Sequence, residues 1–236
     1  VQRLVSLQYT YLHRVLADLK EKGFSFFHPE ELDVKTKAWL RHYFEEQIYP
    51  VVTPLAVDSG HPFPFLANNT INAIVRIFQV QPDGTKDYKI AILPIPSVLD
   101  RIIEVPSSSN KVHRFVYLED VISYYAIQFF QGYGIEESMI FRLTRDADLE
   151  IDEEDAKDLL TEVEASLRRR RRGDAVRLEV VGAGSPELLR TVLASVELEE
   201  KDVYHIDGHL DCRMYFDFSN YPGYDNLRYK PFEPKI

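Results

Sequence analysis

The sequence predicts an α+β fold in which helices pack against a mixed β-sheet, preceded by a short helical N-terminal segment. Apolar residues recur at three- and four-residue steps in some segments and at alternate positions in others. These helix-like and strand-like segments are intermixed, with at least one hairpin, and do not form a strict strand–helix repeat. With 236 residues, the chain is long enough to bury a core of its own.

Two helices are expected at the N-terminal end. The first is indicated by apolar residues at helical spacing: Leu4, Leu7, Tyr11, Val15 and Leu19. Gly23 is suited to end this helix, because glycine readily adopts the left-handed conformation that follows many helix C-termini. The second helix is expected to run from about Asp33, a candidate N-cap, to Ile48.

A proline-rich segment and a β-hairpin are expected next. Residues 49–69 are too apolar for a disordered linker and too rich in proline for a central strand, so we expect a rigid, packed, extended connection. Alternating apolar residues over 70–80 and a second run over 88–93 predict two strands joined by turn residues. The pattern then predicts a short strand over 115–118, a helix over 119–130 and a strand over 139–144.

The segment from Phe141 to Glu179 is strongly polar, with many acidic residues before five consecutive arginines. Asp152 can cap a helix with an acidic first turn and with Arg168 to Arg172 in its last turn, an order that suits the helix dipole. Gly173 fits the position after this helix. The remaining pattern predicts a strand over 175–181, a helix from Ser185 and Pro186 to about 196, a strand over 203–206 and an irregular aromatic segment.

Composition and charge restrict the function. The chain has 45% hydrophobic and 28% charged residues, as ordinary globular proteins do. Its formal net charge of -10 argues against bulk electrostatic attraction to nucleic acid or anionic membranes. The single Cys212 excludes an internal disulfide framework and suggests a reducing compartment. No apolar run is long enough for a transmembrane helix, and the first residues lack the layout of a signal peptide.

The usual motifs for catalysis or cofactor binding are missing from the sequence. There is no phosphate-binding glycine loop; Gly182 and Gly184 are more simply a tight turn, although a glycine pair before a helix can cradle a phosphate. None of the seven histidines shows metal-ligand spacing, since turn residues separate His205 from His209. We find neither a serine elbow nor a cue for a reactive Cys212, and we expect no metal site.

The sharper candidates for a functional site are two arginines and two aspartates: Arg142, Arg145, Asp146 and Asp148. On a strand over 139–144, Arg142 would project from one face and Arg145 from the strand end, where the aspartates could orient them. Two interpretations remain open, a contact to a polyanion or metal phosphate and an Arg–Asp network that braces the corner. Catalysis by the carboxylates is disfavoured, because neighbouring arginines lower a carboxyl pKa and a general acid needs a raised one.

The run from Arg168 to Arg172 is a second cationic candidate. Consecutive helical residues are about 100° apart, so five arginines spread around the whole helix and cannot all face one ligand. A solvated face or an interface therefore explains the run better than a dedicated binding site.

Four segments, in order along the chain, resemble the polyphosphate kinase family. Residues 49–72 are similar to its proline-rich stretch and read YPVVTPLAVDSGHPFPFLANNTIN. Residues 141–160 are similar to the segment of the family that contains TRDAD, and residues 168–179 to the one that contains RG and VRLE. Residues 202–211, DVYHIDGHLD, resemble a later element. The four matches cover most of the chain, which a single short motif could not do.

The resemblance implies the middle, or head, domain of an enzyme that reversibly transfers the terminal phosphate of ATP to inorganic polyphosphate. In that family a phosphohistidine in two C-terminal domains carries the reaction, with magnesium. Residues 1–48 would then be a helical lead-in, residues 49–225 the α+β head domain and residues 226–236 an exit segment towards the C-terminal domains. No catalytic residue is carried over, because none of the histidines corresponds to the nucleophile.

The implied role of this segment is structural, in dimer contacts and in the walls of the active-site tunnel, without activity of its own. ATP and magnesium belong to the parent enzyme, and no cofactor is expected in the segment. Its expected partners are the N-terminal and C-terminal domains of the same enzyme and a second copy, in the cytoplasm or at a membrane. The alternative is a module that binds inorganic polyphosphate through Arg142, Arg145 and part of the run from Arg168 to Arg172.

Overall fold

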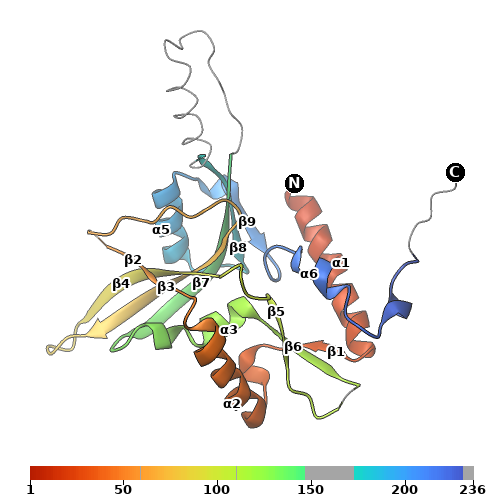
Figure 1. The fold of residues 1–236 in the computed structure, drawn as a ribbon. Helices are drawn as coiled ribbons and strands as arrows, with labels where there is room; N and C mark the ends of the chain where they lie inside the picture. Colours follow the sequence, from red (N-terminus) through yellow and green to blue (C-terminus); the bar gives the residue numbers. More distant parts are fainter. Residues whose placement is uncertain (59, 110, 147–172, 231–236) are drawn as a thin grey trace, which may run out of the picture.

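The computed structural model describes residues 1–58, 60–109, 111–146 and 173–230, and it confirms the predicted α+β class (Figure 1). A six-stranded mixed sheet has the strand order β2-β4-β3-β7-β8-β9, and a separate three-stranded sheet has the order β1-β6-β5. Helices α2 and α3 lie between the two sheets, and α5 covers the other face of the larger one (Figure 1). The predicted helix at 152–172, with its five arginines, lies outside the described residues.

The larger sheet is built on the predicted hairpin. Strands β3 (Ile71–Val80) and β4 (Lys86–Pro94) pair antiparallel, and β7 (Gly134–Arg145) pairs antiparallel with the other side of β3. Strand β8 (Ala175–Val181) continues the antiparallel order, whereas β9 (Val203–Ile206) runs parallel to β8. The parallel pairing requires a crossover, which α5 (Pro186–Val196) supplies. Residues at the start of this helix behave as predicted, since the Ser185 side chain caps it.

Alternation along β7 separates a buried face from a polar face of the sheet. Phe141 and Leu143 are fully buried against α5, together with residues of β8 such as Val180. Arg142 and Thr144 project from the opposite face, as the period of two predicts. The sheet thus presents charged side chains at the end of a face whose remaining part is packed against α2 and α3.

The proline-rich segment contributes one short edge strand, β2 (Leu55–Val57), which pairs with β4. We predicted an extended connection and no strand, and an edge position is where a proline-rich segment can still pair. The predicted second helix is α2 (Val34–Tyr43), capped by Asp33, which continues as a π-helical turn over Phe44–Ile48.

The smaller sheet was only partly predicted. Strand β6 (His113–Tyr117) matches the expected strand, but β5 (Ile102–Val105) and β1 (Phe24–Phe26) were missed. The lead-in is therefore not purely helical, because β1 pairs parallel with β6. Strands of three or four residues carry too little periodicity to be recognised. The helix expected over 119–130 is α-helical only in α3 (Leu118–Tyr124), and a 3-10 turn follows.

Helix α1 (Gln2–Glu21) forms as predicted, but its predicted apolar stripe is not the face that packs on the domain. Tyr9 is the buried residue of this helix, and Val5 and Leu12 pack beside it. Leu4 and Tyr11 of the stripe instead face outwards, 68% and 56% exposed, whereas Val15 and Leu19 line an apolar cavity against the C-terminal segment. Both sets have helical spacing, so periodicity alone could not decide which one contacts the body.

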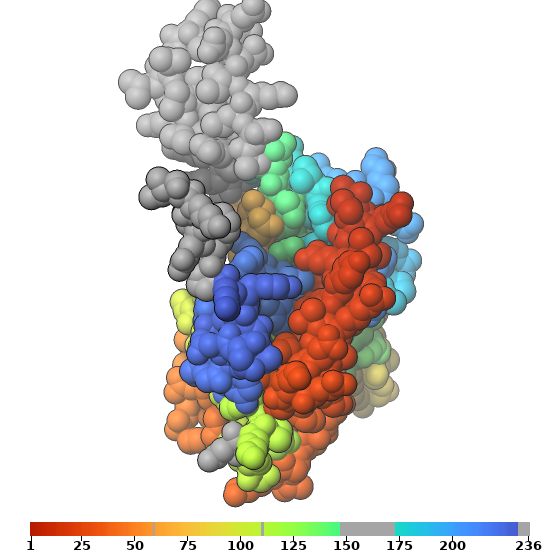
Figure 2. All heavy atoms as spheres, turned by 90° about the vertical axis from the view of Figure 1, so that its right-hand side faces the viewer, coloured from red at the N-terminus to blue at the C-terminus, as the bar shows by residue number. Residues whose placement is uncertain are grey.

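The C-terminal segment returns to α1. It contains the short helix α6 (Met214–Phe218), which we had expected to be irregular, and a 3-10 turn at Asp225–Leu227. Figures 1 and 2 show α1 and this segment side by side, and an apolar cavity of about 450 Å³ lies between them. Aromatic residues of the C-terminal segment, including Phe218 and Tyr221, pack around Phe24 of β1.

Candidate functional site

A polar cavity of about 410 Å³ lies where α1 meets the polar face of β7 and β8. The segment 211–216, which follows β9 and leads into α6, forms another wall. The charged residues of its lining belong to one cluster, which we call the charge ladder: Arg177, Glu179, Arg142, Asp211 and Arg213. Tyr9 and Gln8 of α1 and the single cysteine, Cys212, also line the cavity.

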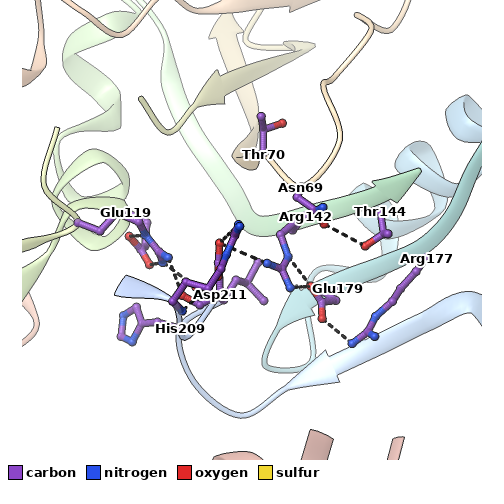
Figure 3. Close-up of polar contacts among 12 residues, drawn as sticks. Asn69, Thr70, Glu119, Arg142, Thr144, Arg177, Glu179, His209 and Asp211 are labelled. Carbon is purple, nitrogen blue, oxygen red and sulfur yellow. Dashed lines mark hydrogen bonds and ion pairs between the residues drawn. The ribbon is translucent and has the colours of Figure 1, made fainter. Parts of the chain in front are cut away.

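The charge ladder alternates cations and anions (Figure 3). Arg177 Nη2 donates to Glu179 Oε1 at 2.5 Å, and Arg142 Nε donates to Glu179 Oε2 at 2.5 Å. Arg142 Nη1 lies 3.4 Å from Asp211 Oδ2. Arg213 completes the ladder with a two-pronged contact to Asp211, in which Nε lies 2.7 Å from Oδ1 and Nη2 2.5 Å from Oδ2. The ladder joins two neighbouring strands to a segment distant in sequence.

Most of the charged side chains in the ladder are shielded from solvent, so their contacts differ from ion pairs at the protein surface. Only 6% of the Glu179 side chain and 16% of the Arg142 side chain is exposed. Burial by itself would raise the pKa of the Asp211 carboxyl, but hydrogen bonds from Arg213 and the charge of Arg142 outweigh it, so that this pKa is lowered. The same hydrogen bond raises the pKa of Arg213. Asp211 is therefore an ionised acceptor and is unsuited to act as a general acid.

Strand register explains how two ladder residues meet. Arg142 lies opposite Glu179 and Thr144 lies opposite Arg177 in the β7–β8 pair. Side chains opposite one another on an antiparallel pair lie close together and on one face. A sequence search could have found Arg177 and Glu179, because they are two residues apart in VRLE and so share a strand face.

The sequence carries no comparable spacing signal for Asp211 and Arg213. A second arginine positions their segment: Arg101 donates to the carbonyl oxygens of Leu210, at 2.7 Å, and Asp211, at 3.0 Å. Arg101 also pairs with the buried Glu119 of α3. Since Arg101, Asp211 and Arg142 are far apart in the sequence, only the tertiary structure brings them together.

The other predicted arginine is placed apart from the ladder. Arg145 donates to the carbonyl oxygens of Leu66 and Gly173, both at 2.9 Å, and its guanidinium lies 4.4 Å from the centre of the Phe65 ring. Burial lowers its pKa, against the opposing charge of Asp174. The backbone N–H of Asp146 donates to Asp174 O at 2.9 Å.

Thus Arg142 and Arg145 leave opposite sides of the strand end and contact different partners. The other predicted site residues, Asp148, Arg168 and Arg172, lie outside the described residues.

The remaining sequence candidates form no second site. Gly182 and Gly184 both have positive φ in a turn, and the Ser185 hydroxyl beyond them contacts the Glu137 carboxylate, so an acid already lies at this helix start. His205 contacts the Gly182 carbonyl oxygen, whereas His209 contacts Asp120. Over the described residues, no group of three or more His, Cys, Asp or Glu side chains is arranged to hold a metal ion.

Among the described helices, none is long and apolar enough to cross a membrane.

Comparison with known proteins gives one consistent result. The family model of the polyphosphate kinase middle domain matches residues 35–218. A polyphosphate kinase of Halalkalibacterium halodurans is 40% identical over 220 residues, which cover 92% of this chain and 31% of the relative. A polyphosphate kinase of Pseudomonas aeruginosa is 35% identical over 238 residues, covering 100% of this chain and 34% of the relative. The chain thus spans about a third of the curated relatives it matches.

The fold also matches a solved structure. The crystal structure of polyphosphate kinase from Porphyromonas gingivalis superimposes with a TM-score of 0.74 at 23% sequence identity. The match covers 100% of this chain and 33% of that one. At this level of identity the likeness concerns the fold alone.

Proposed function

Because the chain belongs to the polyphosphate kinase family, as its middle domain, we propose that it has a structural role within a longer phosphotransferase. In this proposal the domain helps to shape the active-site tunnel and contributes contacts to a dimer. The whole enzyme would transfer the terminal phosphate of ATP, with magnesium, reversibly to inorganic polyphosphate. The nucleophilic histidine would lie in another domain, and the chain by itself would be inactive.

The observation that carries the proposal is the charge ladder. Its buried carboxylates and arginines are paired with one another and join β7, β8 and the segment after β9. An active site needs a group whose pKa is matched to proton transfer or nucleophilic attack, whereas the pKa of Asp211 is lowered. Paired charges that join distant segments are suited to hold a shape.

The outward face of α1 supports the packing role. Leu4, Leu7 and Tyr11 expose between 47% and 68% of their surface, and these apolar side chains form a stripe on one helix. Helices whose apolar stripe faces solvent commonly bury it against another element. The family model begins at residue 35, so this helix lies ahead of the matched middle domain.

Sedimentation and activity together test the role. The full-length enzyme and a version lacking residues 35–218 would be compared by analytical ultracentrifugation and by ATP-dependent polyphosphate synthesis. We expect the deletion to abolish synthesis and to weaken or abolish the dimer. A dimeric, fully active deletion variant would refute the proposal.

A milder variant controls for gross misfolding. Glu179→Gln in the full-length enzyme removes one buried charge of the ladder, and Glu199→Gln removes an exposed one that pairs with Lys201. We expect only Glu179→Gln to reduce synthesis at elevated temperature, in parallel with its loss of stability. Equal effects of the two variants would contradict a role for the ladder in holding the shape.

A further inference from the structure

The C-terminal segment, residues 214–230, is hydrogen-bonded to the body of the domain only through side chains. Over the described residues, its backbone hydrogen bonds join it to itself and to the two residues just before it, Cys212 and Arg213. None of its residues is fully buried. Segments with few buried side chains and purely local hydrogen bonds open at a lower free-energy cost than the core does. The C-terminal segment is therefore suited to local opening.

Apolar packing holds this segment firmly on one side only. Phe218, Tyr221 and Tyr224 pack edge-on against Phe24 of β1, with ring centroids 4.5 to 5.8 Å apart. On the other side, the apolar cavity of about 450 Å³ lies between the segment and α1. Side chains that line a cavity lack the van der Waals contacts that close packing provides. The docking of the segment therefore depends strongly on its polar contacts.

One polar cluster, which we call the histidine latch, joins the middle of the segment to β5 and β6: Glu104, His113, Tyr221 and Tyr224. His113 Nδ1 lies 2.9 Å from Glu104 Oε1 and 2.6 Å from the Tyr221 hydroxyl. His113 Nε2 lies 3.1 Å from the Tyr224 hydroxyl. The Tyr221 hydroxyl donates to Glu104 Oε1 at 2.7 Å. Burial, helped by this hydrogen bond, raises the pKa of Tyr221, so its hydroxyl remains a neutral donor.

His113 is the member of the latch whose side-chain type changes charge near neutral pH. Only 18% of its side chain is exposed, and among the described residues Glu104 supplies the carboxylate in ion-pair contact with it. The other groups that face the imidazole are the hydroxyls of Tyr221 and Tyr224 and the ring of Phe24. We propose that His113 is a proton-dependent switch: its protonation strengthens the docking of the C-terminal segment, and its deprotonation loosens it.

Both protonation states of His113 fit the latch, so the switch acts through charge. The neutral ring donates through Nδ1 and accepts a hydrogen bond from Tyr224 at Nε2, whereas the charged ring donates through both nitrogens. A tyrosine hydroxyl can serve in either role. The charged ring attracts the Glu104 carboxylate, and this attraction is lost when the segment that shields it leaves. Docking therefore strengthens as the pH falls from 8 to 6 and weakens as it rises.

Opening of the segment would uncover the apolar side of α1 that lines the cavity, including Leu16. The switch thus couples proton concentration to the exposure of an apolar surface. This inference goes beyond the structural role and does not depend on it.

Hydrogen exchange of the full-length protein, measured by mass spectrometry on peptides from residues 214–230, tests the switch. Rates at pH 6 and pH 8 would be corrected for intrinsic chemical exchange, with peptides of β3 as the internal reference. We expect the protection of the segment, relative to β3, to be several-fold higher at pH 6. Equal relative protection at the two pH values, or higher protection at pH 8, would overturn the proposal.

Two glutamine variants assign the effect to the latch. Glu104→Gln removes the carboxylate charge at a side chain that is 47% exposed, so the fold should be kept. Glu199→Gln removes an exposed charge that pairs with Lys201, away from the latch. We expect Glu104→Gln to abolish the pH dependence of protection and Glu199→Gln to retain it. A wild-type pH dependence in Glu104→Gln would exclude the latch as its origin and overturn the assignment.

Discussion

At the scale of single residues, Glu179 has the largest expected effect on stability. Its carboxylate accepts hydrogen bonds from two arginines and is almost fully buried. Glu179→Gln keeps the shape but leaves both guanidiniums without their shared anion, so we expect a loss of about 2–4 kcal/mol in the free energy of unfolding. Urea unfolding, followed by circular dichroism, measures this loss in the free energy of unfolding.

The exposed acid Glu199 is the matched control, because it pairs with Lys201 at the surface. Glu199→Gln should leave the urea midpoint unchanged. If Glu179→Gln also leaves it unchanged, the ladder does not stabilise the fold.

Two tyrosines on α1 allow the contribution of a buried hydroxyl to be compared with that of an exposed one. The Tyr9 hydroxyl donates to the carbonyl oxygen of His209 at 2.8 Å, and burial raises the pKa of this tyrosine. Tyr9→Phe keeps the ring but loses the hydrogen bond, so we expect a loss of about 1 kcal/mol. Tyr11→Phe, on the same helix but 56% exposed, should be neutral by the same urea measurement. Equal midpoints for the two variants would mean that the Tyr9 hydroxyl does not hold α1.

At the scale of elements, the junction between α1 and β1 depends on Gly23. Its φ is +94°, and a Cβ there would come within 2.4 Å of the carbonyl oxygen of Lys111. Gly23→Ala combines an unfavourable backbone conformation with a clash against backbone, so we expect a loss of about 2 kcal/mol or more. Faster hydrogen exchange of α1 amides would show that the loss arises at this junction.

Gly60→Ala is the control for Gly23→Ala. An added Cβ at Gly60 meets only the Asp58 carboxylate, at 3.4 Å, and the substitution should change stability by less than about 0.5 kcal/mol. Comparable losses in the two glycine variants would point to a general effect of replacing glycine.

The elements differ in how well the sequence predicts them, for physical reasons. Long strands and capped helices carry their own signal: the ten residues of β3 are rich in isoleucine and valine, and Asp33 and Ser185 cap their helices as expected. Strands β1 and β5 are too short to show a period and form because β6 lies between them. For α1, two apolar faces compete, and the contact with β9 and β1 decides which is buried.

In the candidate site too, the sequence predicts features that depend on a local pattern but not those that depend on contacts between distant segments. Arg142 could be placed on the polar face of a strand because the alternation is local. Its partners Glu179 and Asp211 are fixed by strand register and by the segment that Arg101 holds. Arg145 donates to two backbone carbonyl oxygens, which nothing in the local sequence indicates, and Asp148, one of the two aspartates expected beside it, lies outside the described residues.

At the scale of the whole molecule, stability should depend on pH through carboxylates that accept hydrogen bonds. Hydrogen bonds from Thr36 lower the pKa of Asp33, and those from Arg213 help to lower that of Asp211 despite its burial. A folded-state pKa below the ordinary value of about 4 means that the stabilisation is complete above that pH. It is lost as the pH falls through the folded pKa, so we expect urea midpoints to drop steadily below about pH 4.

Asp211→Asn tests how much of this slope the ladder contributes. Asp211 has a φ of +61°, which asparagine also tolerates, so the backbone should not change. The variant should be less stable at neutral pH and show a shallower decline in acid than the wild type. Asp207→Asn, at a side chain that is 95% exposed, should keep the wild-type slope. An unchanged slope in Asp211→Asn would show that this carboxylate does not titrate with unfolding.

The charge ladder also has a consequence for folding kinetics. It can close only after β7, β8 and the segment after β9 have met, since each contributes a charge from a different part of the chain. Contacts between residues far apart in sequence form after much of the chain entropy has been lost. The ladder should therefore be open in the transition state for folding, and breaking it should speed unfolding while hardly slowing folding. Its charges then govern how long the native domain persists, more than how fast it forms.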